Sequence, residues 1–170
     1  MHGPRGALAV AVVLVAAACD DTTAPATSFD ATLRGDNEVP AVSSTGTATA
    51  TFTITATSIT YTLRVQTLPA TGITAAHIHT AAAGVSGPVR VTMCGGATAP
   101  GNQACPATAG GSVTGTWTYA SGSTAVEGTP AMTFDALVSA LHNVGAYANV
   151  HTSANGGGEI RGQIVVTPAP

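Results

Sequence analysis

The chain has 170 residues, a formal net charge of −3 and only 8% charged residues, and all five basic residues are arginines. This weak negative charge excludes the basic surface that nucleic-acid binding needs, and it gives no attraction to an anionic membrane surface. Solubility must therefore depend on threonine, serine, asparagine and glycine, a composition typical of extracytoplasmic β proteins.

A targeting segment occupies residues 1–19. Arg5 supplies a positive charge, an apolar run follows it, and three alanines at 16–18 precede Cys19. This is the pattern of a secretory signal peptide, whose apolar region is too short to span a bilayer. Because Cys19 directly follows the alanines, the segment also resembles a bacterial lipoprotein signal, in which that cysteine is acylated. An ordinary signal peptide cleaved nearby is the alternative. We expect a cell-envelope lipoprotein, on the periplasmic face or the cell surface, or alternatively a secreted protein.

Residues 20–28 (DDTTAPATS) are small and polar. They cannot bury enough apolar surface to offset the entropy of ordering, so we expect a flexible tether. Residues 29–167 remain, and their number suits one domain. This domain contains Cys94 and Cys105, eleven positions apart. In an exported protein we expect these two cysteines to form a disulfide that closes one loop.

Alternation of apolar and polar residues dominates the domain and predicts β-strands. In TATATFTITAT (47–57) threonines alternate with apolar residues, and a second alternating run follows at 59–66, which predicts a tight hairpin. The predicted strands are 29–34, 47–57, 59–66, 73–79, 89–93, 113–119, 146–152 and 159–167. About eight short strands with turns rich in glycine and proline predict an all-β fold, an antiparallel Greek-key sandwich or barrel.

One segment departs from this alternation. Phe134, Leu137, Val138 and Leu141 recur at helical spacing, and Thr133 is available as an N-cap. We expect a single short amphipathic helix that closes one end of the sandwich.

Five short motifs follow one another along the domain. They are LRGDNEVP (33–40), AHIH (76–79), GVSGPV (84–89), YANVHT (147–152) and GEIRGQI (158–164). In this order they closely resemble the CHRD domain, the chordin-type repeat. The resemblance implies the fold. It implies no activity, because fold analogy does not transfer function, and the growth-factor partner of the animal domain is not carried over.

Three histidines in these motifs form a candidate site. His77 and His79 are two positions apart on a predicted strand and therefore share a face. His151 lies on another predicted strand, in phase with Tyr147 and Asn149. If the two strands are neighbours, three imidazoles converge on a site suited to copper or zinc. A hydrogen-bonded structural cluster is the alternative.

Glu38, Glu159 and Arg161 also lie within the motifs. We expect them to form an ion-pair group that specifies the fold, since a carboxylate and a guanidinium can pair bidentately. A glycosidase-like pair of Glu38 with Glu159 is the alternative. Trp117 is expected to pack against the sheet, and Arg90 is expected to be solvated.

The sequence contains no nucleophile elbow, phosphate-binding loop, dinucleotide fingerprint or classical zinc spacing. We therefore expect an exported, lipid-anchored binding or structural module without catalytic machinery, whose partner is a protein, a glycan or a small ligand. The alternative is a copper- or zinc-binding protein that uses His77, His79 and His151, with a mononuclear copper redox activity as its enzymatic form.

Overall fold

The structure is a computed structural model that describes residues 27–67, 72–99, 102–119 and 127–168. The predicted signal peptide, Cys19 and the first seven residues of the predicted tether lie outside these ranges. The first strand begins at Thr27, two residues before the predicted start of the domain. Within the described ranges, no helix is both long and apolar enough to cross a membrane.

Short strands are the main regular structure of the described residues, which confirms the all-β prediction. They are β1 (Thr27–Arg34), β2 (Thr47–Ile54), β3 (Ser58–Thr67), β4 (Ile73–His79), β5 (Val89–Cys94), β6 (Ser112–Thr118), β7 (Tyr147–Thr152), β8 (Ile160–Gln163) and β9 (Val165–Val166). A 3-10 turn, η1 (Gly35–Asn37), follows β1, and one helix, α1 (Phe134–His142), lies between β6 and β7.

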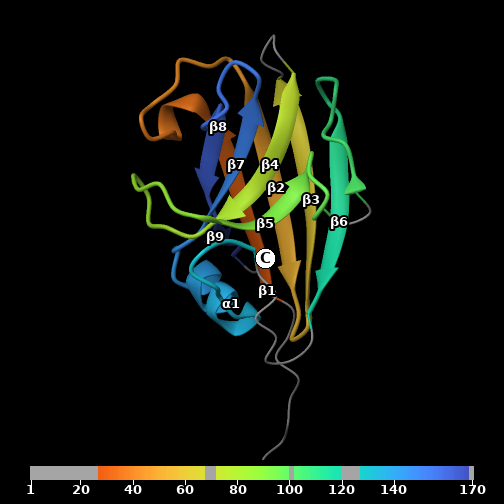
Figure 1. The fold of residues 1–170 in the computed structure, drawn as a ribbon, viewed down its shortest axis with the longest axis vertical. Coiled ribbons are helices and arrows are strands. Elements are labelled where there is room, and N and C mark those ends of the chain that lie inside the picture. Colours follow the sequence, from red (N-terminus) through yellow and green to blue (C-terminus); the bar gives the residue numbers. More distant parts are fainter. Residues whose placement is uncertain (1–26, 68–71, 100–101, 120–126, 169–170) are drawn as a thin grey trace, which may run out of the picture.

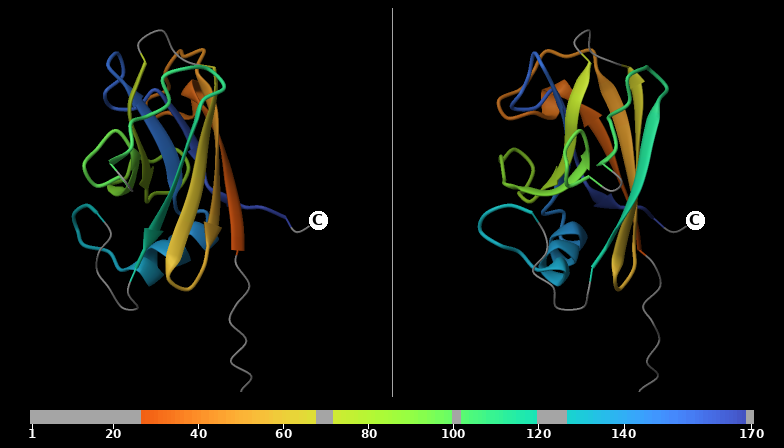
Figure 2. Two further views of the ribbon diagram at one scale, coloured as in Figure 1. Left: turned by 90° about the vertical axis from the view of Figure 1, so that its right-hand side faces the viewer. Right: turned by 45° about the vertical axis from the view of Figure 1, so that its right-hand side comes forward.

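The strands form one antiparallel sheet in the order β5-β4-β7-β8-β1-β2-β3-β6, with β9 paired to β1. This sheet curls until its two end strands, β5 and β6, approach each other, and the result is a nearly closed barrel (Figures 1 and 2). The neighbours β4 and β7, β8 and β1, and β3 and β6 are not consecutive in the chain. The strands are therefore not connected as a simple meander. Long connections between non-consecutive neighbours are a feature of Greek-key folds.

Alternate residues of each strand supply the apolar core inside the barrel. Buried side chains of the predicted hairpin are Ala48, Ala50, Phe52, Ile54, Ile59, Tyr61, Leu63 and Val65. Between them, the threonines of β2 and β3 project outwards. The Tyr61 hydroxyl donates a hydrogen bond to the carbonyl of Met93, which connects β3 to β5 across the core.

Helix α1 lies at one end of the barrel (Figure 2). Its apolar side chains Phe134, Leu137 and Leu141 are buried. The predicted N-cap is confirmed, because the Thr133 hydroxyl accepts a hydrogen bond of 3.1 Å from the backbone N–H of Ala136.

The predicted strand at 159–167 is divided in the structure. β8 pairs with β7, whereas β9 pairs with β1. The break is at Ile164, whose side chain is fully buried. Ile160, Ile164 and Val166 keep an even spacing through this change of partner, so the sequence pattern alone does not reveal it.

Candidate metal site

Strands β4 and β7 are neighbours and present the three predicted histidines on one face of the sheet. Ala76 and Ile78 of β4 point into the core, so His77 and His79 project from the outer face. On β7, His151 lies opposite Ala75 in the register. The predicted condition for convergence, that the two strands are neighbours, is therefore met.

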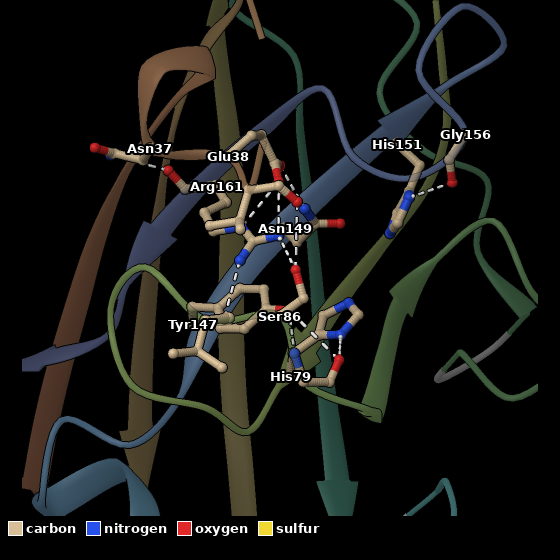
Figure 3. A network of polar contacts seen from close by, with 12 residues as sticks. Asn37, Glu38, His79, Ser86, Tyr147, Asn149, His151, Gly156 and Arg161 are labelled. Carbon is tan, nitrogen blue, oxygen red and sulfur yellow. Dashed lines mark hydrogen bonds and ion pairs between the residues drawn. The ribbon is translucent and has the colours of Figure 1, made fainter. Parts of the chain in front are cut away.

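Other segments of the chain pack over this outer face of the sheet. Tyr147 and Asn149, which accompany His151 on it, are only 2% and 1% exposed. A loop at residues 80–88 and the segment around Glu38 lie over them, as Figure 3 shows. Both faces of β7 are thus shielded from water, and polar groups on the outer face need partners within the protein.

His77, His79 and His151 form a compact cluster, which we call the three-histidine site. One ring nitrogen from each residue lies within 4.8 Å of the others. Three such atoms share a centre no more than about 2.8 Å from each, compared with about 2.0–2.1 Å for a zinc–imidazole bond. An inward movement of less than about 1 Å per ring would bring all three to bonding distance.

Two of the rings are oriented by backbone carbonyls. His79 Nδ1 is 2.8 Å from the Gly87 oxygen, and His151 Nδ1 is 3.0 Å from the Gly156 oxygen. A carbonyl only accepts, so each Nδ1 carries the proton and donates it. The Nε2 atoms of His79 and His151 therefore carry the free lone pairs. This arrangement is characteristic of metal-ligating histidines.

One further ring nitrogen of each histidine has no protein partner among the described residues. His77 Nδ1, His79 Nε2 and His151 Nε2 are buried and accept or donate no hydrogen bond within the described residues. In the part of the chain that the structure describes, they are three of the five buried side-chain atoms in this state. Since unsatisfied buried polar atoms are costly and rare, their concentration at one point indicates a site for a ligand.

Burial keeps these rings neutral. It lowers the pKa of His77 to about 4, assisted by the charges of His151 and His79 and opposed by Glu127. Burial likewise lowers the pKa of His79 to about 4, against its hydrogen bond to Gly87. The pKa of His151 is lowered by burial and by Arg161. Neutral imidazole is the form that binds metal.

A stack of three groups supports His79. Its ring lies parallel to the Tyr147 ring, with centroids 4.8 Å apart and 6° between the planes. The Arg161 guanidinium lies over the same phenol ring at 4.1 Å. Arg161 Nε and Nη2 both lie 2.8 Å from Glu38 Oε2, and Asn149 Nδ2 donates to Glu38 Oε1 at 2.5 Å. Burial raises the pKa of Glu38, and Arg161 opposes that shift.

The ion-pair prediction is confirmed for Glu38 with Arg161 and is wrong for Glu159. Glu159 accepts hydrogen bonds from neutral groups, namely the Ser44 hydroxyl, the Thr152 hydroxyl at 2.9 Å and the Asn155 amide. Burial alone would raise the pKa of Glu159, but these hydrogen bonds outweigh it and leave the pKa below its usual value. The expected bidentate geometry is also absent, because both arginine nitrogens reach one oxygen.

Cys94 and Cys105 form the predicted disulfide. Cys94 is fully buried at the end of β5, directly opposite Ala76 of β4. The bridge therefore anchors the loop after β5 next to the strand that carries two of the histidines.

Two further predictions have opposite outcomes. Trp117 packs as expected, stacked on Tyr61 with ring centroids 4.3 Å apart. Arg90 is not solvated as predicted: it is 4% exposed and donates to the Thr80 hydroxyl at 2.9 Å and to the Pro130 carbonyl at 2.6 Å. Its strand has its outer face covered by a later segment, which alternation cannot indicate.

Sequence reasoning missed Glu127. Its carboxylate accepts from the backbone N–H of Thr92 at 3.1 Å and from the Thr92 hydroxyl at 2.8 Å. Thr92 lies opposite His77 in the sheet, and Glu127 favours the charged form of that histidine. Glu127 lies in no motif, so no local signal could have identified it.

The comparisons with known proteins agree with the motifs. Among curated proteins, none matches the chain. The family model of the CHRD domain matches residues 29–164, which include the three-histidine site and both buried glutamates. The chain therefore belongs to the CHRD domain family.

Proposed function

We propose that this CHRD domain is a metal-binding module that holds one copper or zinc ion at the three-histidine site. Two observations carry the proposal: one ring nitrogen from each of the three histidines lies within 4.8 Å of the others, and each histidine has a buried ring nitrogen without a partner. Two of the three histidines donate Nδ1–H to a backbone carbonyl, which leaves Nε2 free to bind a metal.

The donor set selects the metal. Only imidazoles form the cluster, and the two cysteines of the described chain are joined in a disulfide. Copper and zinc accept neutral imidazole readily, whereas calcium and magnesium require oxygen ligands. Three protein ligands leave a coordination position open for water or a small ligand.

The cellular setting that we propose is the cell envelope. It is supported by the signal-like segment at 1–19, by Cys19 as an acylation position and by a disulfide suited to an oxidising compartment. In this setting the domain would store, deliver or sense the metal, without catalysis. A mononuclear copper redox activity is the enzymatic variant of the same proposal.

Titration of the purified protein with Cu(II) and with Zn(II) tests the proposal, beside His77→Ala/His79→Ala. His142→Ala is the matched control, since His142 is exposed at the end of α1 and contacts Phe29 instead. We expect one ion per chain in the wild type and the control, and none in the double variant. Equal binding by all three proteins would refute the site.

The alternative is a module in which the histidines only support the fold and the function is to bind a protein, glycan or small ligand. It is favoured by the hydrogen bonds and ring stacking that engage two of the three histidines. In that case metal neither binds nor stabilises the wild type, and the double variant is merely less stable.

A further inference from the structure

We infer that the two buried glutamates, Glu38 and Glu159, are positioning residues of the metal site, each fixing the backbone carbonyl that orients one histidine ligand. This inference rests on the proposed function, because it concerns the affinity and geometry of the same site. It assigns a metal-related role to residues that otherwise serve only the fold.

The first connection, which we call the His79 arm, begins at Glu38. This carboxylate is 5% exposed and holds Arg161, whose Nη1 donates to the Val85 carbonyl at 3.2 Å. The loop that Arg161 restrains continues within two residues to Gly87, whose carbonyl accepts from His79 Nδ1. Glu38 therefore acts on His79 through one arginine and one loop (Figure 3).

Tyr147 strengthens this arm from the sheet side. Its hydroxyl accepts a hydrogen bond of 3.1 Å from the Gly87 N–H, while its ring lies between the Arg161 guanidinium and the His79 ring. Gly87 has no room for a side chain, because a β-carbon there would lie 2.1 Å from the Thr80 carbonyl oxygen. The position of the Gly87 carbonyl is thus fixed from both sides.

The second connection, the His151 arm, begins at Glu159, which is 4% exposed. Glu159 accepts from the Asn155 side-chain amide and from the Thr152 hydroxyl, and that hydroxyl also accepts from the Asn155 N–H at 3.1 Å. These bonds shape the turn between β7 and β8. The next residue in that turn is Gly156, whose carbonyl accepts from His151 Nδ1.

The two arms have the same chemical logic. A carbonyl that accepts from Nδ1 keeps the proton there and leaves Nε2 free for a metal, and a rigid carbonyl fixes the direction of that lone pair. Loss of such outer partners typically weakens metal binding by about 10–100-fold. A buried carboxylate that served the fold alone would lower stability without altering the coordination geometry.

The test uses two variants that change no charge, so that electrostatic effects on a cation are avoided. Tyr147→Phe removes the hydroxyl that binds Gly87, and Asn155→Ala removes the amide that binds Glu159. Glu38→Gln and Glu159→Gln address the carboxylates themselves. Thr133→Ala is the control for a general loss of stability, because it removes the cap of α1, and the hydrogen bonds of Thr133 to the described residues go to Ala136 and Leu137 of that helix.

Cu(II) affinity is measured by competition with a chelator. The electron paramagnetic resonance spectrum reports the coordination geometry. Circular dichroism of the metal-free proteins checks that each variant folds. We expect folded variants of both arms to bind Cu(II) about 10–100-fold more weakly than Thr133→Ala and to show altered hyperfine splitting. If a glutamate variant does not fold, the two neutral variants decide.

The outcomes separate the two claims. A wild type that binds no metal refutes the proposed function, and this inference with it. A wild type that binds one ion, while the folded arm variants keep the affinity and spectrum of Thr133→Ala, overturns the inference alone and leaves the metal site standing.

Discussion

Acidification should destabilise the metal-free protein through its buried histidines. The pKa of His77 and of His79 is about 4 in the folded chain, against about 6.5 in the unfolded chain. The unfolded state therefore binds protons first as the pH falls, so stability is complete above pH 6.5 and is lost progressively between about pH 6.5 and 4. Because the pKa of His151 is also lowered, its protonation likewise reduces stability at acidic pH.

The magnitude follows from these values. At pH 5, a histidine with a pKa of 4 when folded and 6.5 when unfolded loses about 2 kcal/mol of stability. His79 is 8% exposed, so we assign it the whole loss of about 2 kcal/mol. His77 is half-buried, so we assign it about half of that loss because solvent screens its charge. The expected loss between pH 7.5 and 5 is therefore about 3 kcal/mol, or a fall in Tm of roughly 6–12 °C.

The assay is urea unfolding of the protein in the presence of chelator at half-unit pH intervals from 7.5 to 5. We expect a clear slope for the wild type, a shallower one for His79→Gln, and the wild-type slope for Thr133→Ala, which removes no titratable group. Carboxylates with ordinary or lowered pKa values contribute little above pH 5, whereas the raised pKa of Glu38 acts with the opposite sign, so the comparison with His79→Gln is what isolates the histidine contribution. A stability that does not change across the window, or a slope that His79→Gln leaves intact, would show that the buried histidines do not cause the loss of stability.

Three further outcomes are expected. Arg161→Ala should destabilise the protein by about 3–5 kcal/mol in chemical unfolding, because it leaves the buried Glu38 carboxylate unpaired; a loss below 1 kcal/mol would contradict the burial of the pair. Cys94→Ser/Cys105→Ser should cost roughly 2–3 kcal/mol, since the bridge closes a short loop, and an unchanged Tm would argue against that account. Gly87→Ala should weaken Cu(II) binding by displacing a carbonyl that orients His79, whereas the affinity of the wild type would show that the loop absorbs the β-carbon.

The sheet was predictable because its strands follow one physical rule. Alternation in β2 and β3 places apolar residues in the core and threonines outside, and the hairpin follows from their proximity in the chain. The disulfide and the capped helix were also predictable, since each depends on residues close in sequence. The pairing of the strands was harder to predict. Nothing local in the sequence indicates that β8 ends at Gln163 or that β9 pairs with β1.

The sequence allowed us to predict which three histidines form the site. It did not allow us to predict the backbone groups that surround them. The spacing of His77 and His79 fixed a shared face, but their closeness to His151 depended on β4 pairing with β7, a long-range contact. The carbonyls of Gly87 and Gly156 leave no sequence signal as hydrogen-bond acceptors. They belong to the backbone, and their positions arise only when the loops fold over the sheet.

The coordination shell of a bound ion shows whether His77, His79 and His151 are its ligands. X-ray absorption spectroscopy of the copper- or zinc-loaded protein counts the imidazoles around the metal and measures their distances. We expect three imidazole nitrogens at about 2.0–2.1 Å for zinc, and one fewer for each of His77→Ala, His79→Ala and His151→Ala. A shell of oxygen ligands, or a spectrum that none of these variants changes, would contradict this expectation.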